Sequence, residues 1–160
     1  MVKDIRGGYR LVNQLQEIKN LAGSVNVPKN IKIETAKETN FKDKIMNKQF
    51  VDTNYILRLL LKDNLEQYNF VLKFFSDSVT SNAKLVSNIV VLFQVYWVLI
   101  KVIKLEKEKT NILIYNFLQL GIIEFRDNEI ILKALEKDSE NSLDLQNNFH
   151  LAWCENHKIS

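Results

Sequence analysis

The stretch Phe50-Val51-Asp52-Thr53-Asn54 decides the fold of this chain. An apolar, β-prone run from Gln49 to Val51 ends there in a carboxylate, and the helix-capping residues Thr53 and Asn54 follow it. Open α/β sheets place their ligands where a strand ends and feeds a helix, which is the position of Asp52. Asp52 is therefore a candidate site residue or simply a helix cap, and the local pattern leaves both interpretations open.

The sequence around this stretch alternates between strand-like and helix-like segments. We expect strands at 48–52, 84–87 and 122–126, and helices at 55–62, 65–77, 89–102, 106–120, 129–137 and 145–157. Short strands separated by helices are typical of a parallel sheet covered on both faces, joined by right-handed crossovers. The sequence therefore predicts an α/β protein, a three-layer α/β/α fold with a short central parallel sheet.

Charge and composition divide the chain near Met46. Residues 1–45 carry nine Lys or Arg and five Asp or Glu, whereas residues 46–160 carry thirteen and fourteen. An apolar stripe at helical spacing from Leu11 to Ala22 predicts a helix, residues 25–33 an extended arm and residues 35–44 a polar linker. We therefore expect an N-terminal appendage at 1–45, too poor in apolar surface to fold alone, and a domain at 46–160.

Several protein classes are disfavoured by composition. The single cysteine, Cys154, rules out an internal disulfide framework, and its apolar neighbours favour a buried thiol. The N-terminus lacks the apolar core of a signal peptide, and the longest apolar run, Ile89–Ile100, is too short to cross a bilayer. We expect a soluble, cytoplasmic protein without a membrane partner.

Four blocks of sequence, taken in order, resemble a known family. They are Met46–Asn54, Tyr55–Leu61, Phe93–Leu99 and Leu143–His150. With this spacing the chain resembles PIN domains, and among them the VapC-type toxins of bacterial toxin–antitoxin pairs. The resemblance implies a Mg²⁺- or Mn²⁺-dependent endoribonuclease with three or four acidic side chains, RNA as substrate, a cognate antitoxin as partner and homodimerisation as an open alternative. Carboxylates suit this chemistry because hard divalent ions bind oxygen ligands and activate water.

The chain departs from the family pattern at its acidic positions. Asp52 fills the first, but the second is Gln94 and the third is Asn147, and the strand that would carry the fourth is not found before Ser160. The resemblance thus implies metal binding by Asp52 and, as an alternative to a helix N-cap, by Asp144. Amides form hydrogen bonds but bring no negative charge, so we expect weak binding of Mg²⁺ or Mn²⁺.

Further residues around this site carry expectations with alternatives. Asn54, Arg58 and His150 are candidates for substrate binding, although Arg58 also suits an ordinary exposed arginine. Gln94 interrupts an apolar helix, so we expect its amide to face a polar pocket or, alternatively, to bond the backbone inside the core. We expect the aromatic residues of the same helix, Phe93, Tyr96 and Trp97, to belong to the core.

These observations predict a PIN-like protein that is catalytically impaired or inactive. Two alternatives remain open at this point. One is an active metal-dependent ribonuclease toxin, which depends on Asp52. The other is a non-enzymatic remnant that binds RNA or an antitoxin, in which residues 1–45 would derive from an antitoxin and Met46 from the original start of the toxin.

Overall fold

The computed structural model describes residues 16–17, 19–21, 25, 48–81, 83–140 and 143–159. The chain divides into two compact units, residues 1–86 and 87–160, and each unit is described by itself. Residues 16–17 and 19–21 are helical, within the helix expected at 11–22, and Val25 is a buried bend. The rest of the expected appendage, including the arm at 25–33 apart from Val25, lies outside the described residues.

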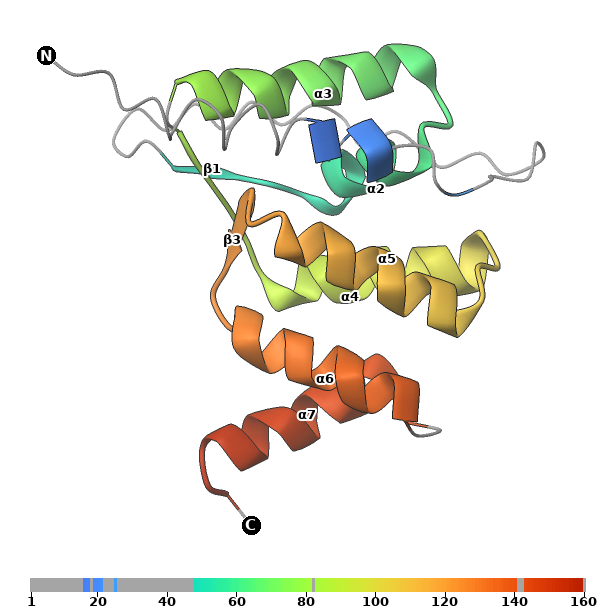
Figure 1. The fold of residues 1–160 in the computed structure, drawn as a ribbon, viewed down its shortest axis with the longest axis vertical. Helices are drawn as coiled ribbons and strands as arrows, with labels where there is room; N and C mark the ends of the chain where they lie inside the picture. The colour runs from blue at the N-terminus through green and yellow to red at the C-terminus, as the bar shows by residue number, and fades with distance from the viewer. Residues whose placement is uncertain are drawn as a thin grey trace, which may run out of the picture. The chain divides into compact units, whose positions relative to one another are not determined.

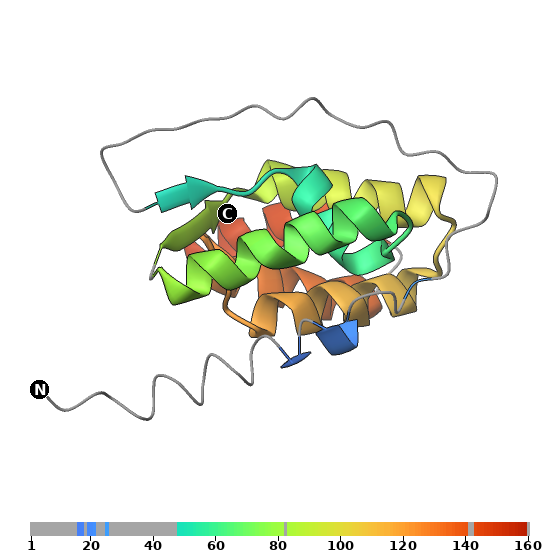
Figure 2. The same ribbon diagram turned by 90° about the horizontal axis from the view of Figure 1, so that it is seen from above.

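The first unit contains a parallel pair of strands and a helical hairpin. β1 (Lys48–Phe50) pairs in parallel with β2 (Lys84–Ser87), with Lys48 opposite Lys84, and Figure 2 shows the two arrows side by side. The Val51 amide extends this pairing by donating to the Val86 carbonyl at 2.9 Å. Strand β1 is shorter than the expected 48–52 because Asp52 already begins the next helix as its N-cap.

The helices of the first unit form as their apolar spacing predicts. α2 (Thr53–Leu61) buries the apolar residues that follow Tyr55, and α3 (Leu65–Thr80) packs against it through Tyr55 and Phe74, whose ring centroids lie 4.8 Å apart. Lys62 ends α2 in the left-handed conformation, and its amide donates to the Arg58 carbonyl. The two helices are labelled in Figure 1.

The second unit is mainly helical. Its elements are α4 (Ile89–Trp97), the π-helical turn η1 (Val98–Val102), α5 (Lys107–Gln119), β3 (Ile123–Phe125), α6 (Asn128–Glu140) and α7 (Leu145–Asn156). The helix expected at 89–102 is present, but its last turn is π-helical. Gly121 follows α5 with a positive φ of 60°, a conformation that glycine adopts without steric cost. Figure 1 shows α6 and α7 side by side.

These elements make the chain mixed α/β, as the sequence predicts, with three short strands among many helices. The core of the second unit contains the fully buried residues Leu92, Leu99, Ile114, Ile131, Ala134 and Leu145. Tyr96 joins this core, but the expectation that Trp97 does so is wrong, because 58% of Trp97 is exposed. Within the described ranges, no helix combines the length and apolar character that a membrane crossing requires.

Candidate functional site

Asp52 lies directly after β1 and acts as the N-cap of α2. Its backbone is extended, and Oδ1 accepts a hydrogen bond from the Thr53 amide at 2.5 Å. The cap therefore lies one residue before the expected caps, Thr53 and Asn54, and the helix begins at Thr53, two residues before the expected start at 55. Capping is a confirmed role of this carboxylate, whereas metal binding by the exposed Asp52 and RNA binding by the partly exposed Asn54 stay predictions.

Arg58 differs from one of the two expectations stated for it. It is 6% exposed, and its Nη1 forms an ion pair with Asp63 Oδ2 at 2.5 Å. The left-handed turn at Lys62 reverses the chain, which brings the Asp63 carboxylate back over the last turn of α2. The expectation of an exposed surface arginine is therefore wrong, and its guanidinium is already committed to a carboxylate. Contact with RNA stays a prediction.

The remaining predicted site residues belong to the second unit. Gln94 on α4 and Asn147 and His150 on α7 are all exposed. Gln94 is exposed, so the alternative of a core amide is wrong. It is not among the residues that line the pocket described below, and the expectation that its amide faces a polar pocket stays a prediction. Helices α4 and α7 touch through Phe93 and Phe149, whose rings meet edge to face at 5.6 Å.

Asp144 is the N-cap of α7. Its Oδ1 accepts a hydrogen bond from the Asn147 amide at 2.8 Å, which satisfies one of the amides that the first turn of a helix leaves unpaired. The expectation of a capping role is confirmed. A metal-binding role stays a prediction, as does the convergence of Asp52 with Gln94 and Asn147, which lie in the other unit.

A buried carboxylate that the sequence analysis did not single out lies between the helices of the second unit. The side chain of Asp138 on α6 is 0% exposed. Its Oδ2 accepts from the Tyr96 hydroxyl and from Asn111 Nδ2, both at 2.8 Å, and its Oδ1 accepts from Asn148 Nδ2 at 3.2 Å. The donors come from α4, α5 and α7, so this one residue joins all four helices. Such full satisfaction is what a buried charge requires.

Lys107 completes this polar network. Its Nζ lies 3.2 Å from Asp138 Oδ1 and donates to the Leu143 carbonyl at 2.8 Å. The ion pair is asymmetric, because the lysine side chain is 38% exposed and the carboxylate is fully buried. Burial, together with the hydrogen bond to Asp138, raises the pKa of the Tyr96 phenol well above its usual 10.0, so the hydroxyl stays protonated as a donor.

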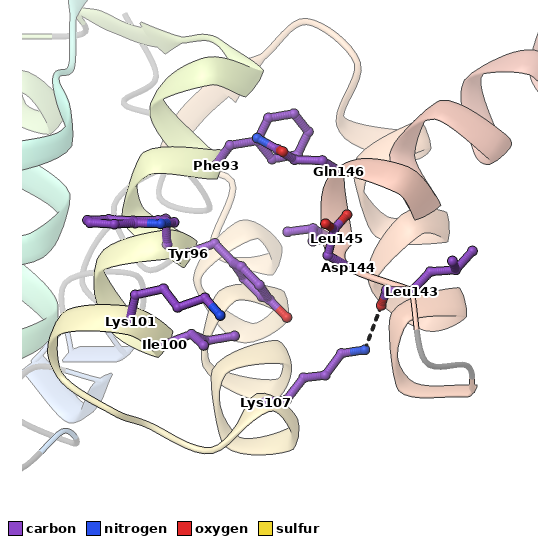
Figure 3. A pocket seen from close by; sticks show the side chains of 10 residues that line it. Phe93, Tyr96, Ile100, Lys101, Lys107, Leu143, Asp144, Leu145 and Gln146 are labelled. Carbon is purple, nitrogen blue, oxygen red and sulfur yellow. Dashed lines mark hydrogen bonds between the residues drawn. The ribbon is translucent and has the colours of Figure 1, made fainter.

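A pocket of about 310 Å³ lies beside the network, within the second unit. Its walls come from two segments, the α4–η1 helix and the start of α7, with Lys107 between them (Figure 3). The lining residues are Phe93, Tyr96, Trp97, Ile100, Lys101, Lys107, Leu143, Asp144, Leu145 and Gln146. The pocket is therefore mainly apolar and aromatic, with a few polar groups, as small-molecule sites usually are.

Among the residues that the structure describes, no group of three or more His, Cys, Asp or Glu side chains gathers in a way that would hold a metal ion. Comparison of the chain with protein-family models, with curated proteins and with solved structures found no match.

Proposed function

We propose that this chain is a PIN-like protein, similar to VapC-type toxins, whose metal-dependent ribonuclease centre is catalytically impaired. One observation carries the proposal: Gln94 and Asn147, which stand where the family pattern has acids, are exposed amides on two helices that touch. Exposed side chains on contacting helices are accessible to a ligand. Amides, however, leave the site without the charge that a hard dication needs.

The proposal includes a three-layer α/β/α arrangement for the domain. It is supported by the parallel pairing of β1 with β2 and by the alternation of helices with strands along the chain. In this arrangement Asp52 lies at the carboxyl end of a parallel strand, where open α/β sheets bind ligands. RNA, an antitoxin-like protein and a second copy of the chain are the partners that this family resemblance suggests.

Asp138 is not part of the proposed metal site. Both of its oxygens already accept hydrogen bonds inside the second unit, and its side chain is fully buried. Asp52 and Asp144 differ from it, because both are exposed and each accepts a capping hydrogen bond through Oδ1. They are the carboxylates that a weakly bound Mg²⁺ or Mn²⁺ would contact.

Restoring the missing charges tests the proposal. The variant Gln94→Glu with Asn147→Asp should bind Mn²⁺ more tightly than the wild type in a calorimetric titration. A carboxylate at ~4 Å attracts a divalent ion by about 2 kcal/mol even in water, so two of them should raise the affinity tenfold or more after screening. The control is Asn116→Asp with Gln119→Glu, which adds the same charges to exposed positions of α5. Equal affinity in the two variants would refute the proposed site.

An RNA-cleavage assay tests the loss of activity. In about 5 mM Mg²⁺, the wild type should cleave a fluorescent oligoribonucleotide no faster than Asp52→Asn does. Both rates should be roughly the uncatalysed rate. The asparagine variant is preferable to alanine because it keeps a side-chain oxygen to cap α2 and removes only the charge. Mg²⁺-dependent cleavage by the wild type that disappears in Asp52→Asn would establish the active ribonuclease instead.

A further inference from the structure

We infer that the pocket of the second unit is a binding site for a small, planar aromatic anion. Its volume of about 310 Å³ is at the lower end of the range of small-molecule sites, so it fits one compact ligand and not a helix or a strand. This inference goes beyond the proposed function and does not depend on it, because none of Asp52, Gln94 and Asn147 lines the pocket and Asp144, which does, is not a group that would bind an anion.

The aromatic wall of the pocket determines the shape of the ligand. Phe93, Tyr96, Trp97 and Ile100 follow one another at i, i+3, i+4 and i+7, so they form a continuous stripe along α4 and η1. Trp97 is 58% exposed although it is the largest apolar side chain of this stripe. An exposed indole beside a cavity offers a flat face on which another aromatic ring can stack.

Tyr96 lines the pocket, and buried side chains hold its hydroxyl in place. The hydroxyl is held by Asp138 at 2.8 Å and by Asn111 at 2.9 Å, both buried. These bonds fix the orientation of the ring, and with it one wall of the pocket, before any ligand binds. The buried Leu145 adds an aliphatic surface from α7. These two residues therefore hold part of the pocket lining in place before a ligand binds.

The charged residues of the pocket determine the charge of the ligand. Lys107 is paired with Asp138 and the Leu143 carbonyl, and the Asp144 carboxylate faces the positive end of α7 as its cap. Lys101 is exposed, and no ion pair joins it to any other residue in the described part of the chain. Figure 3 shows Lys101 pointing into the pocket from the wall across from Asp144. The anionic group should therefore lie at Lys101 and away from Asp144.

Calorimetric titration of the full chain with three probes tests this inference. Indole-3-acetate carries a carboxylate, guanosine 5′-monophosphate carries a phosphate, and tryptamine presents the indole ring with a positive charge. We expect at least one anion to bind with a Kd below about 1 mM, and tryptamine to bind at least about fivefold more weakly. Which of the two anions binds shows whether the anionic group of the ligand is a carboxylate or a phosphate. If neither anion binds, or if tryptamine binds equally well, the inference is wrong.

Two surface variants locate the binding. Trp97→Ala should weaken binding of the anion about tenfold by removing the stacking face, and Lys101→Gln should weaken it up to about fivefold. Trp153→Ala and Lys133→Gln are the matched controls, because both side chains lie outside the pocket lining and are exposed. Circular dichroism should show that each variant is folded. An affinity that is unchanged in either pocket variant, or reduced equally in its control, would overturn the inference.

Discussion

Replacement of Asp138 by asparagine should strongly destabilise the second unit while leaving its shape almost unchanged. The carboxylate accepts from Tyr96 and Asn111 at one oxygen, and from Asn148 and Lys107 at the other. An asparagine has one acceptor and one NH₂ group. In either orientation its NH₂ must therefore face the NH₂ of Asn111 or of Asn148, and these side chains are buried.

The size of the effect follows from this geometry. One buried donor left without an acceptor costs about 1–3 kcal/mol, and the remaining hydrogen bonds lose their charge assistance, roughly another 1 kcal/mol. The lost attraction to Lys107 adds little, because that side chain is 38% exposed and its ammonium can turn to water. We expect Asp138→Asn to lower the free energy of unfolding by about 2–4 kcal/mol.

Urea denaturation followed by tryptophan fluorescence measures the change in the free energy of unfolding of the second unit. The chain has two tryptophans, Trp97 and Trp153, and both lie in residues 87–160. The control is Glu124→Gln, an exposed acid-to-amide change in β3 that should alter the free energy by less than about 0.5 kcal/mol. If Asp138→Asn is as stable as Glu124→Gln, the carboxylate does not hold the helices together as argued.

Two further predictions concern single side chains. Burial and the hydrogen bond to Asp138 raise the pKa of Tyr96, so the folded state favours the neutral phenol; stability is intact below pH 10 and falls as the pH rises above it. Between pH 9 and 11 the free energy of unfolding, measured by urea titration, should therefore fall on the order of 1 kcal/mol further in the wild type than in Tyr96→Phe. Equal losses in the two proteins would contradict the raised pKa of Tyr96. Asp144→Ala should cost about 1 kcal/mol in thermal or urea unfolding by removing the cap on the Asn147 amide, whereas Asp144→Asn should cost only a few tenths. Equal losses in the two Asp144 variants would show that charge and not capping is what matters at that position.

Local patterns predicted the elements of the described chain well. The strand at 84–87 has the expected bounds, and the ends of α5 and α7 fall within one residue of the expected ones. These elements begin and end at strong local signals, such as Asp144 before α7 and Gly121 after α5. The π-helical turn after Trp97 has no such signal, because it differs from an α-helix only in the spacing of its hydrogen bonds.

Side-chain surroundings were harder to predict than helices. Trp97 and Gln94 lie in a helix that is apolar almost all round, so the sequence does not indicate which face is buried. Arg58 was expected at the surface by its type, but its pairing with Asp63 depends on a left-handed turn at Lys62 that the sequence does not mark with glycine or asparagine. In each case the environment depends on a neighbour whose position is set by the tertiary structure.

The buried network did leave a signal in the sequence, because each polar member stands on the apolar stripe of its helix. Asp138 follows Ile131 and Leu135 at i+7 and i+3, and Asn148 lies three residues after Leu145 and four before Ala152. A charged residue on such a stripe is expensive to bury unless it is paired. Periodicity alone therefore indicates that Asp138 is buried and needs partners, but not which ones, since its donors come from positions 10 to 42 residues away.

The same network links the stability of the second unit to its pocket. Tyr96 and Lys107 each belong to both, so the bonds that hold Asp138 also hold one aromatic wall and one charged edge of the cavity in place. A site supported in this way loses less conformational freedom when a ligand binds, which favours affinity. A substitution that removes the hydrogen bond from Asn148 to Asp138 should then weaken the binding of an aromatic anion. Asn148 does not line the pocket, so no group that contacts the anion would be removed.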